Sequence, residues 1–194
     1  MKYILSQLRV SLIAVVTLAV LLCGIYPVIV WGLAQIFFPD QANGSFIKLD
    51  GKVVGSKLLA QNFTGNQYFH PRPSCAGDAG YDAASSGGSN LGPTSKRLIE
   101  EVKDRIAAYR EANNLSANAT IPADAVTASA SGLDPHISVE NALLQASRVA
   151  KARGMSEDAV KEKIKIYTEG RGLGLLGEPR VNVLELNLAL DGKL

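Results

Sequence analysis

Residues 10–38 read VSLIAVVTLAVLLCGIYPVIVWGLAQIFF and contain no charged side chain. A helix needs about 20 apolar residues to cross the hydrocarbon core of a bilayer, and this run is longer than that. No water reaches the backbone inside a bilayer, so its N–H and C=O groups must bond to one another, and a helix achieves this within one segment. The sequence therefore predicts one transmembrane helix over residues 10–38, to which the rest of the chain is attached.

A cleaved signal peptide and a lipoprotein anchor are the two alternatives for this stretch, and both fit less well. A signal peptide has an apolar core of about 7–15 residues followed by small residues at a cleavage site. Here the apolar run continues through Trp31 and Phe37. A lipoprotein would use Cys23, but Leu22 stands where a small residue is expected. A retained span is the better interpretation.

Three residues inside the span point to its shape and its contacts. Pro27 lacks a backbone donor, which predicts a kink in the helix. Gly24 and Gly32 offer smooth surfaces that a second membrane helix can approach closely, so both are candidates for partner contact. The alternative is that glycine is simply frequent in membrane helices.

The charges that flank the span predict its orientation. Lys2 and Arg9 precede it without an acidic neighbour, and the first charge after it is Asp40. Cytoplasmic flanks of membrane helices carry an excess of Lys and Arg. Residues 1–9 are therefore expected in the cytoplasm and residues 39–194 on the extracytoplasmic side.

The part that follows the span has the size and charge of one ordinary domain. The chain holds 20 Lys and Arg and 18 Asp and Glu. Setting Lys2 and Arg9 aside leaves the two signs equal, so nothing in the charge predicts nucleic-acid binding. About 155 residues suffice for one hydrophobic core. Cys75 is the only cysteine beyond the span, so no intrachain disulfide is expected there.

A polar stretch interrupts this domain over residues 64–95, which read TGNQYFHPRPSCAGDAGYDAASSGGSNLGPTS. Structureless loops longer than about 12–15 residues are uncommon in compact domains unless they are functional or disordered. Tyr68, Phe69 and Tyr81 provide anchors for packing, which argues against disorder. The sequence therefore predicts a long, ordered, functional loop.

His70, Arg72 and Asp82 are the loop residues that we single out as candidates for partner contact. The alternative is that they hold the fold of the loop itself. His70 and His136 are the only histidines, and with nearby aspartates they could form a metal site, but their spacing matches no known ligand pattern. No G-x-S-x-G motif is present either, so no enzyme site is evident and none is predicted.

Periodicity and capping residues predict the remaining elements of an α+β fold. Glycines punctuate short β-favouring pieces over residues 46–59, which predicts a hairpin or a pair of strands. Apolar residues recur at helical spacing after Ser95, Ser138 and Ser156. Residues 126–132 fit either a short strand or an ordered loop, and 133–137 a turn. Residues 183–190 alternate like a strand, yet Asn182 can cap a helix there, and we expect a helix.

Four blocks of the sequence, in order along nearly the whole chain, resemble the C subunit of the Kdp-type potassium-transporting ATPase. They are YFHPRPS (68–74), YDAASSGGSNLGPTS (81–95), VTASASGLDPHIS (126–138) and RVNVLELNLAL (180–190). The resemblance implies a non-catalytic subunit of the bacterial inner membrane. Its partners would be the potassium-conducting A subunit, the P-type ATPase B subunit and the small F subunit.

The resemblance also implies a link to ATP, although no cofactor of the chain's own is expected. The C subunit is credited with raising the ATP affinity of the B subunit, on the strength of a signature similar to L-S-G-G-Q. Residues 85–89 read SSGGS here and lack the leucine and the glutamine. By the resemblance, Gln145 is the candidate nucleotide-linked residue, with an exposed or interface amide as the alternative.

Three hypotheses follow for the function of the chain. It is an assembly subunit whose domain caps the outer mouth of the potassium path, a nucleotide-handling cofactor of the ATPase subunit, or an independent membrane-anchored hydrolase. An extracytoplasmic domain cannot touch cytoplasmic ATP, so the predicted orientation favours the first of these.

Overall fold

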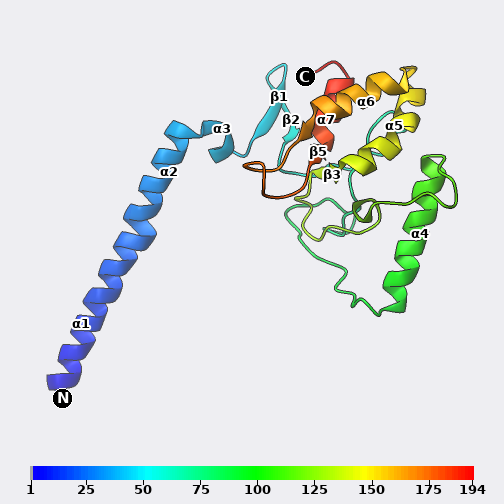
Figure 1. The fold of residues 1–194 in the computed structure, drawn as a ribbon. Helices are drawn as coiled ribbons and strands as arrows, with labels where there is room; N and C mark the ends of the chain where they lie inside the picture. The colour runs from blue at the N-terminus through cyan, green and yellow to red at the C-terminus, as the bar shows by residue number, and fades with distance from the viewer. Residues whose placement is uncertain (1) are drawn as a thin grey trace. The chain divides into compact units, whose positions relative to one another are not determined.

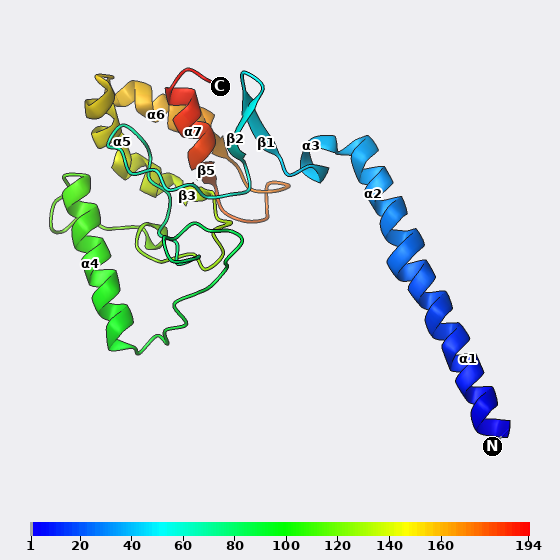
Figure 2. The same cartoon turned by 180° about the vertical axis from the view of Figure 1, so that it is seen from behind.

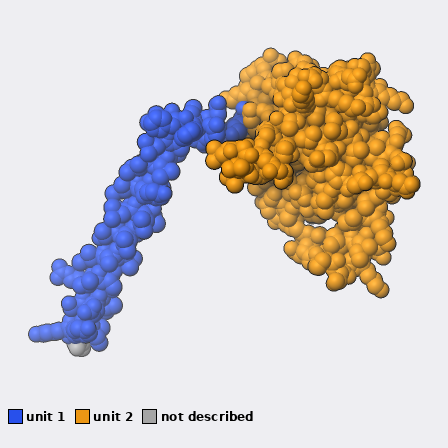
Figure 3. Space-filling view, viewed as in Figure 1, with its two compact units in different colours: residues 1–46 blue, residues 47–194 orange. Residues whose placement is uncertain are grey.

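A computed structural model describes residues 2–194 (Figure 1). The chain divides into two compact units, residues 1–46 and residues 47–194 (Figure 3). Residues 39–46, which the sequence assigns to the domain after the span, group with the first unit.

The first unit is a long apolar helix. Its parts are α1 (Lys2–Ala19), η1 (Val20–Ile25) and α2 (Tyr26–Phe37), and a short helix α3 (Pro39–Ala42) follows. Together Lys2–Phe37 form 36 helical residues with a mean hydropathy of 2.7 in their most apolar window, enough to cross a membrane. This confirms the predicted apolar helix, which begins well before residue 10 and ends at Phe37.

The helix is widened where a kink is predicted. Residues Val20–Ile25 form a π-helical segment, and Pro27 lies in the first turn of α2 directly after it. Proline has no N–H to donate, and its ring would collide with the carbonyl four residues earlier in a regular α-helix. A wider π turn relieves that collision, and such turns are a recognised cause of helix distortion.

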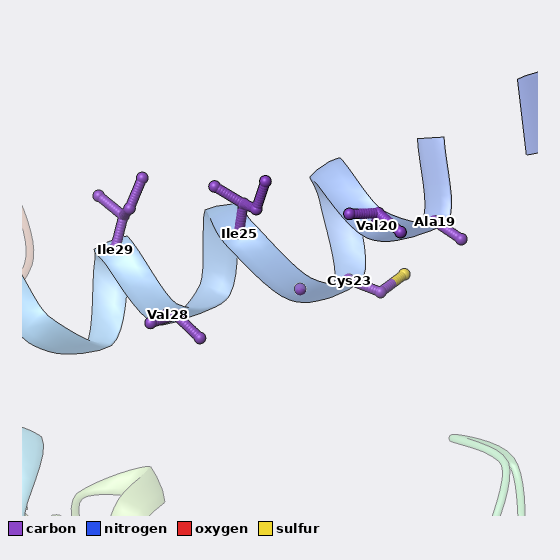
Figure 4. A pocket seen from close by; sticks show the side chains of 7 residues that line it. Ala19, Val20, Cys23, Ile25, Val28 and Ile29 are labelled. Atoms are coloured by element: carbon purple, nitrogen blue, oxygen red, sulfur yellow. The ribbon is translucent and has the colours of Figure 1, made fainter. Parts of the chain in front are cut away.

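Gly24 leaves a shallow apolar depression on this helix, lined by Ala19, Val20, Cys23, Gly24, Ile25, Val28 and Ile29 (Figure 4). Among the described residues, apart from the adjacent residues and the helix's own nearby backbone, no atom lies within 4 Å of a Cβ built on Gly24 or on Gly32. The fold of the chain itself therefore does not require glycine at these two positions. Their contact with a partner helix stays a prediction.

A small antiparallel sheet organises the second unit. Its strands are β3 (His136–Ser138), β5 (Arg180–Asn182) and β4 (Thr168–Glu169), in the order β3-β5-β4. Ile137 on β3 and Thr168 on β4 both pair with Val181 on the central strand. The predicted turn over residues 133–137 is therefore wrong at its end, where His136 and Ile137 are strand residues. Pairing with the distant β5, which local sequence does not reveal, makes them so.

Three helices pack beside this sheet: α5 (Val139–Arg153), α6 (Glu157–Ile166) and α7 (Val183–Leu190) (Figures 1 and 2). Their predicted N-caps are confirmed, because the side chains of Ser138, Ser156 and Asn182 each accept a hydrogen bond from a backbone N–H three residues later. The helix expected over residues 183–190 is confirmed as well.

The main core lies between these helices and the sheet. Its largest fully buried apolar side chains are Phe69, Ile137, Ile164, Leu186, Val149, Val160 and Val181. Phe69 comes from the long polar loop, so the loop contributes a core residue. A smaller cluster joins Ile47 of the hairpin to Leu184 and Leu188 of α7.

The remaining elements lie at the margins of the second unit. The predicted hairpin consists of β1 (Phe46–Leu49) and β2 (Lys52–Ser56). The predicted helix after Ser95 is α4 (Lys96–Ala112), and none of its side chains is fully buried. A single 3₁₀ turn, η2 (Ala123–Ala125), precedes residues 126–132, which form an ordered irregular segment rather than a strand.

Candidate functional site

The middle of the long polar loop, residues 72–87, is attached to residues 126–132. Ser74 and Ser129 form an isolated parallel bridge. The Cys75 N–H donates to the Ser129 carbonyl at 2.8 Å, and the Ser129 N–H donates to the Pro73 carbonyl at 2.8 Å. Further along, the Gly87 N–H donates to Ala130 O at 2.8 Å. Two irregular segments therefore satisfy each other's backbone groups, as predicted for an ordered loop.

Gln145 on α5 fixes the beginning of this loop. Its Oε1 accepts from the His70 N–H at 2.7 Å and from Arg148 Nη2 at 2.8 Å. Its Nε2 donates to the His70 carbonyl at 3.1 Å and to Asn141 Oδ1 at 2.8 Å. All four hydrogen-bonding positions of the amide are thus used inside the domain. Only 1% of Gln145 is exposed, so the interpretation as an exposed amide is wrong.

Arg148, one turn further along α5, holds the same loop from the other side. Its Nη1 donates to the carbonyls of Asn66 and Tyr68 at 2.7 and 2.9 Å. Its Nε donates to Asn113 Oδ1 at 2.9 Å. The residue is 6% exposed, and burial lowers the pKa of its guanidinium. Within residues 2–194, the atoms that accept hydrogen bonds from Arg148 are neutral carbonyl oxygens.

The N-terminal end of α5 continues this network. Tyr109 on α4 donates its hydroxyl to Asn141 Oδ1 at 2.7 Å, and Asn141 Nδ2 donates to Asp124 at 2.9 Å. Asp124 also accepts from the backbone N–H and the hydroxyl of Ser138, both at 2.8 Å. Burial, and then the negative charge of Asp124, raise the pKa of the Tyr109 phenol. The phenol therefore stays a neutral donor.

A second side-chain amide holds the loop from α7. Asn187 Oδ1 accepts from the Phe69 N–H at 2.8 Å, and its Nδ2 donates to the Phe69 carbonyl at 3.0 Å. We call Asn141, Gln145, Arg148 and Asn187 the amide–guanidinium cluster. Sequence reasoning missed Arg148 and Asn187. Asn141, Gln145 and Arg148 recur at helical spacing on one face of α5, and this polar stripe was a usable signal.

The three loop residues proposed for partner contact differ in how many contacts they make within the chain. Arg72 pairs with Asp134 at 2.6 Å and donates to the Thr127 carbonyl at 3.3 Å, so it is committed within the chain. His70 lies 3.1 Å from the Gly65 carbonyl through Nε2. Asp82 is exposed and accepts from the Ala84 N–H at 2.9 Å in a local turn. Asp82 is exposed and the other two are partly buried, and contact of any of the three with a partner stays a prediction.

The other predicted features are spread over the domain. His136 faces Glu169 across the sheet, 3.6 Å away. Within residues 2–194, no group of three or more His, Cys, Asp and Glu side chains is placed to hold a metal ion. The SSGGS segment is part of the loop contact, because Ser86 Oγ donates to the Ser131 carbonyl at 3.2 Å.

Acidification is expected to weaken the fold through its histidines. Burial, helped by the positive charge of Arg148, lowers the pKa of His70 below 6.5, and burial lowers that of His136. The unfolded chain then binds more protons than the folded one, so the free energy of unfolding falls as the pH drops below about 6.5 and levels off below the folded-state pKa. Urea unfolding across this range should show the decrease. His70→Gln should remove part of it, and an unchanged slope would contradict the assignment.

Together these observations define a membrane-anchored protein: one apolar helix followed by an α+β domain with a locked polar loop. A family model described as "K+-transporting ATPase, c chain" matches residues 8–192. The chain belongs to this family, KdpC, which confirms the resemblance read from the four sequence blocks.

Curated relatives agree along nearly their whole length. The "Potassium-transporting ATPase KdpC subunit" of Mycobacterium bovis (strain BCG / Pasteur 1173P2) is 55% identical over 185 residues, which cover 95% of this chain and 97% of the relative. Proteins of the same name from Nitratidesulfovibrio vulgaris and Rhodospirillum rubrum are 55% and 54% identical over 187 residues, covering 96% of this chain and 94% and 96% of the relatives.

Proposed function

We propose that this chain is a non-catalytic accessory subunit of an ATP-driven, high-affinity potassium uptake pump. It stabilises the assembly, and residues 47–194 cap the outer mouth of the potassium-conducting A subunit. The P-type ATPase B subunit and the small F subunit complete the complex. Its relatives are named as a subunit of a potassium-transporting ATPase, which supports membership in such a complex. The basic flank before the span supports an extracytoplasmic position of the domain.

The locked loop is the observation that carries this proposal. Side chains of α5 and α7 hold the backbone of residues 66–70 through buried hydrogen bonds. A segment fixed in this way keeps one shape, and a preformed surface binds a partner without the entropic cost of ordering it. The side-chain hydrogen bonds of the domain thus make this segment rigid, and a rigid surface is suited to capping a partner subunit.

Direct nucleotide handling is less well supported. Gln145, the candidate nucleotide-linked residue, already uses every hydrogen-bonding position inside the domain. Binding ATP through it would require breaking buried bonds, each costing about 1–3 kcal/mol. The chain can still influence ATP affinity indirectly, provided that it binds two states of the pump with different affinities.

Removing residues 47–194 while keeping residues 1–46 is expected to reduce the yield of intact complex by about tenfold or more, because the docking surface is lost. The measurement is the recovery of all subunits from membranes through a tag on the A subunit, together with the potassium concentration at half-maximal uptake. Residues 1–46 must still be found in the membrane. Full recovery with unchanged potassium affinity would refute the proposed role.

Thiol labelling in intact cells is expected to place the domain outside. Cys75 is half-buried, so Asn118→Cys at an exposed position is the better reporter, in a background carrying Cys23→Ser and Cys75→Ser. A membrane-impermeant maleimide should label this chain in intact cells as fully as after lysis. Labelling only after the cytoplasmic face is opened would reverse the orientation and bring direct nucleotide handling forward.

A further inference from the structure

The connection between β4 and β5 presents three leucines to solvent. Leu173 is 93% exposed, Leu175 82% and Leu176 67%. All residues from 171 to 180 are exposed, and in Figure 1 this connection is the dark orange loop that leads into β5. We call residues 171–178, RGLGLLGE, the leucine loop. Exposed leucines are unfavourable in water relative to buried ones.

The leucine loop is held in one conformation by its own hydrogen bonds. The Gly172 N–H donates to the Leu176 carbonyl, and the Leu176 N–H donates to the Gly172 carbonyl, both at 2.8 Å. The Gly174 N–H donates to the Arg171 carbonyl at 3.0 Å. An ion pair between Arg171 and Glu178, 2.7 Å long, closes its base. The leucines are therefore displayed on a preformed turn.

Leu173 adopts a backbone conformation that disfavours a side chain. Its φ is +53°, in the left-handed region where glycine is the favoured residue. Glycine at this position would relieve both the backbone strain and the exposure of the side chain. A strained conformation that also exposes a large apolar group serves neither folding nor solubility, and such strain concentrates at binding sites.

The charges around the leucine loop indicate whether it binds a lipid surface or a protein. Arg171 pairs with Glu178, and Arg180 pairs with Glu169 at 2.9 Å. Segments that lie on bilayers commonly add unpaired basic residues, which anionic headgroups attract, to their apolar side chains. Here each arginine is neutralised by a partner. Such a neutral rim around an apolar centre is the composition of a protein–protein contact.

We propose that the leucine loop is a docking knob that fills an apolar, polar-rimmed pocket on the outward surface of the potassium-conducting partner subunit. This inference rests on the proposed function, since it names the element through which the domain engages that subunit. Three leucines offer an apolar patch of a few hundred Å², the size at which surface patches are commonly functional. A rigid knob of this size anchors the orientation of the domain.

Leu173→Gly separates docking from folding. In the full chain, co-produced with its partner subunits, this variant should reduce recovery of the chain with the tagged A subunit by about tenfold or more. Its resistance to urea should equal or exceed that of the parent, because glycine favours the observed φ. Ile166→Ala, at a 63% exposed side chain on α6, is the matched control and should leave recovery unchanged. Undiminished recovery of Leu173→Gly would overturn the proposal.

A photoreactive amino acid at position 175 identifies what the loop touches. Irradiation of membranes that hold the assembled complex should join this chain to the A subunit. Adducts with lipid, adducts only with another subunit, or no adduct would overturn the knob. If thiol labelling at position 118 shows that the domain is cytoplasmic, both the proposed function and the docking of the leucine loop are refuted. Labelling of position 118 from outside the cell, without a cross-link from position 175 to the A subunit, would overturn only the proposed docking of the leucine loop.

Discussion

Replacing Arg148 by alanine is expected to lower the free energy of unfolding by about 3–5 kcal/mol. The guanidinium is buried and donates to the carbonyls of Asn66 and Tyr68, to Asn113 Oδ1 and to Gln145 Oε1. Its removal takes one donor from each of these acceptors, which costs about 1–3 kcal/mol for a buried one such as Asn113 Oδ1, and opens a cavity beside α5. The effect exceeds that of an ordinary surface ion pair because the Arg148 side chain is buried and makes several hydrogen bonds.

Pulse proteolysis in urea, applied to the full chain in detergent micelles, measures this change. Lys151→Ala is the matched control, because Lys151 is a long basic side chain on the same helix that is exposed. It should stay within about 0.5 kcal/mol of the parent. Arg148→Lys should recover only a part of the loss, since one ammonium group cannot reach the acceptors that the planar guanidinium spans. A loss below about 1 kcal/mol for Arg148→Ala would contradict the role given to it.

The elements that could be predicted from the sequence are those encoded locally. Ser138, Ser156 and Asn182 cap the three core helices as their positions indicated, and residues 10–37 of the apolar run lie within one helix. Strands β3, β4 and β5 have only two or three residues each. Strands this short show no periodicity, and the pairing of β3 with β5 joins residues more than forty positions apart.

The site was harder to predict than the fold for the same physical reason. A glutamine in the middle of an amphipathic helix is usually exposed. Gln145 is buried because the backbone of His70, 75 positions earlier, supplies its partners. The polar loop was recognisable as unusual from its composition, but the side chains that hold it come from helices that are distant in sequence. Arg72 was a candidate for partner contact, and its pairing with Asp134 is equally long-range.

Asn187→Ala is expected to lower the free energy of unfolding by about 3–4 kcal/mol. Asn187 is 1% exposed and Phe69 is fully buried, and the amide satisfies both the N–H and the carbonyl of Phe69. Alanine leaves two buried backbone groups unpaired and a void where the amide was. Because Phe69 is the core residue that the loop contributes, its release should also loosen the loop around it, so the loss will not be confined to one hydrogen bond.

Two measurements separate this explanation from a general packing effect. Hydrogen exchange at the Phe69 amide should accelerate by about two orders of magnitude or more in Asn187→Ala, in proportion to the stability lost. Asn187→Asp keeps the size and the acceptor but sets a second oxygen against the Phe69 carbonyl. Its stability should therefore recover partly on acidification, when protonation restores a donor. Asn118→Ala, at an exposed asparagine, is the control and should change neither quantity. If the Phe69 amide stays as protected as in the parent, the two-bond pairing does not hold the loop.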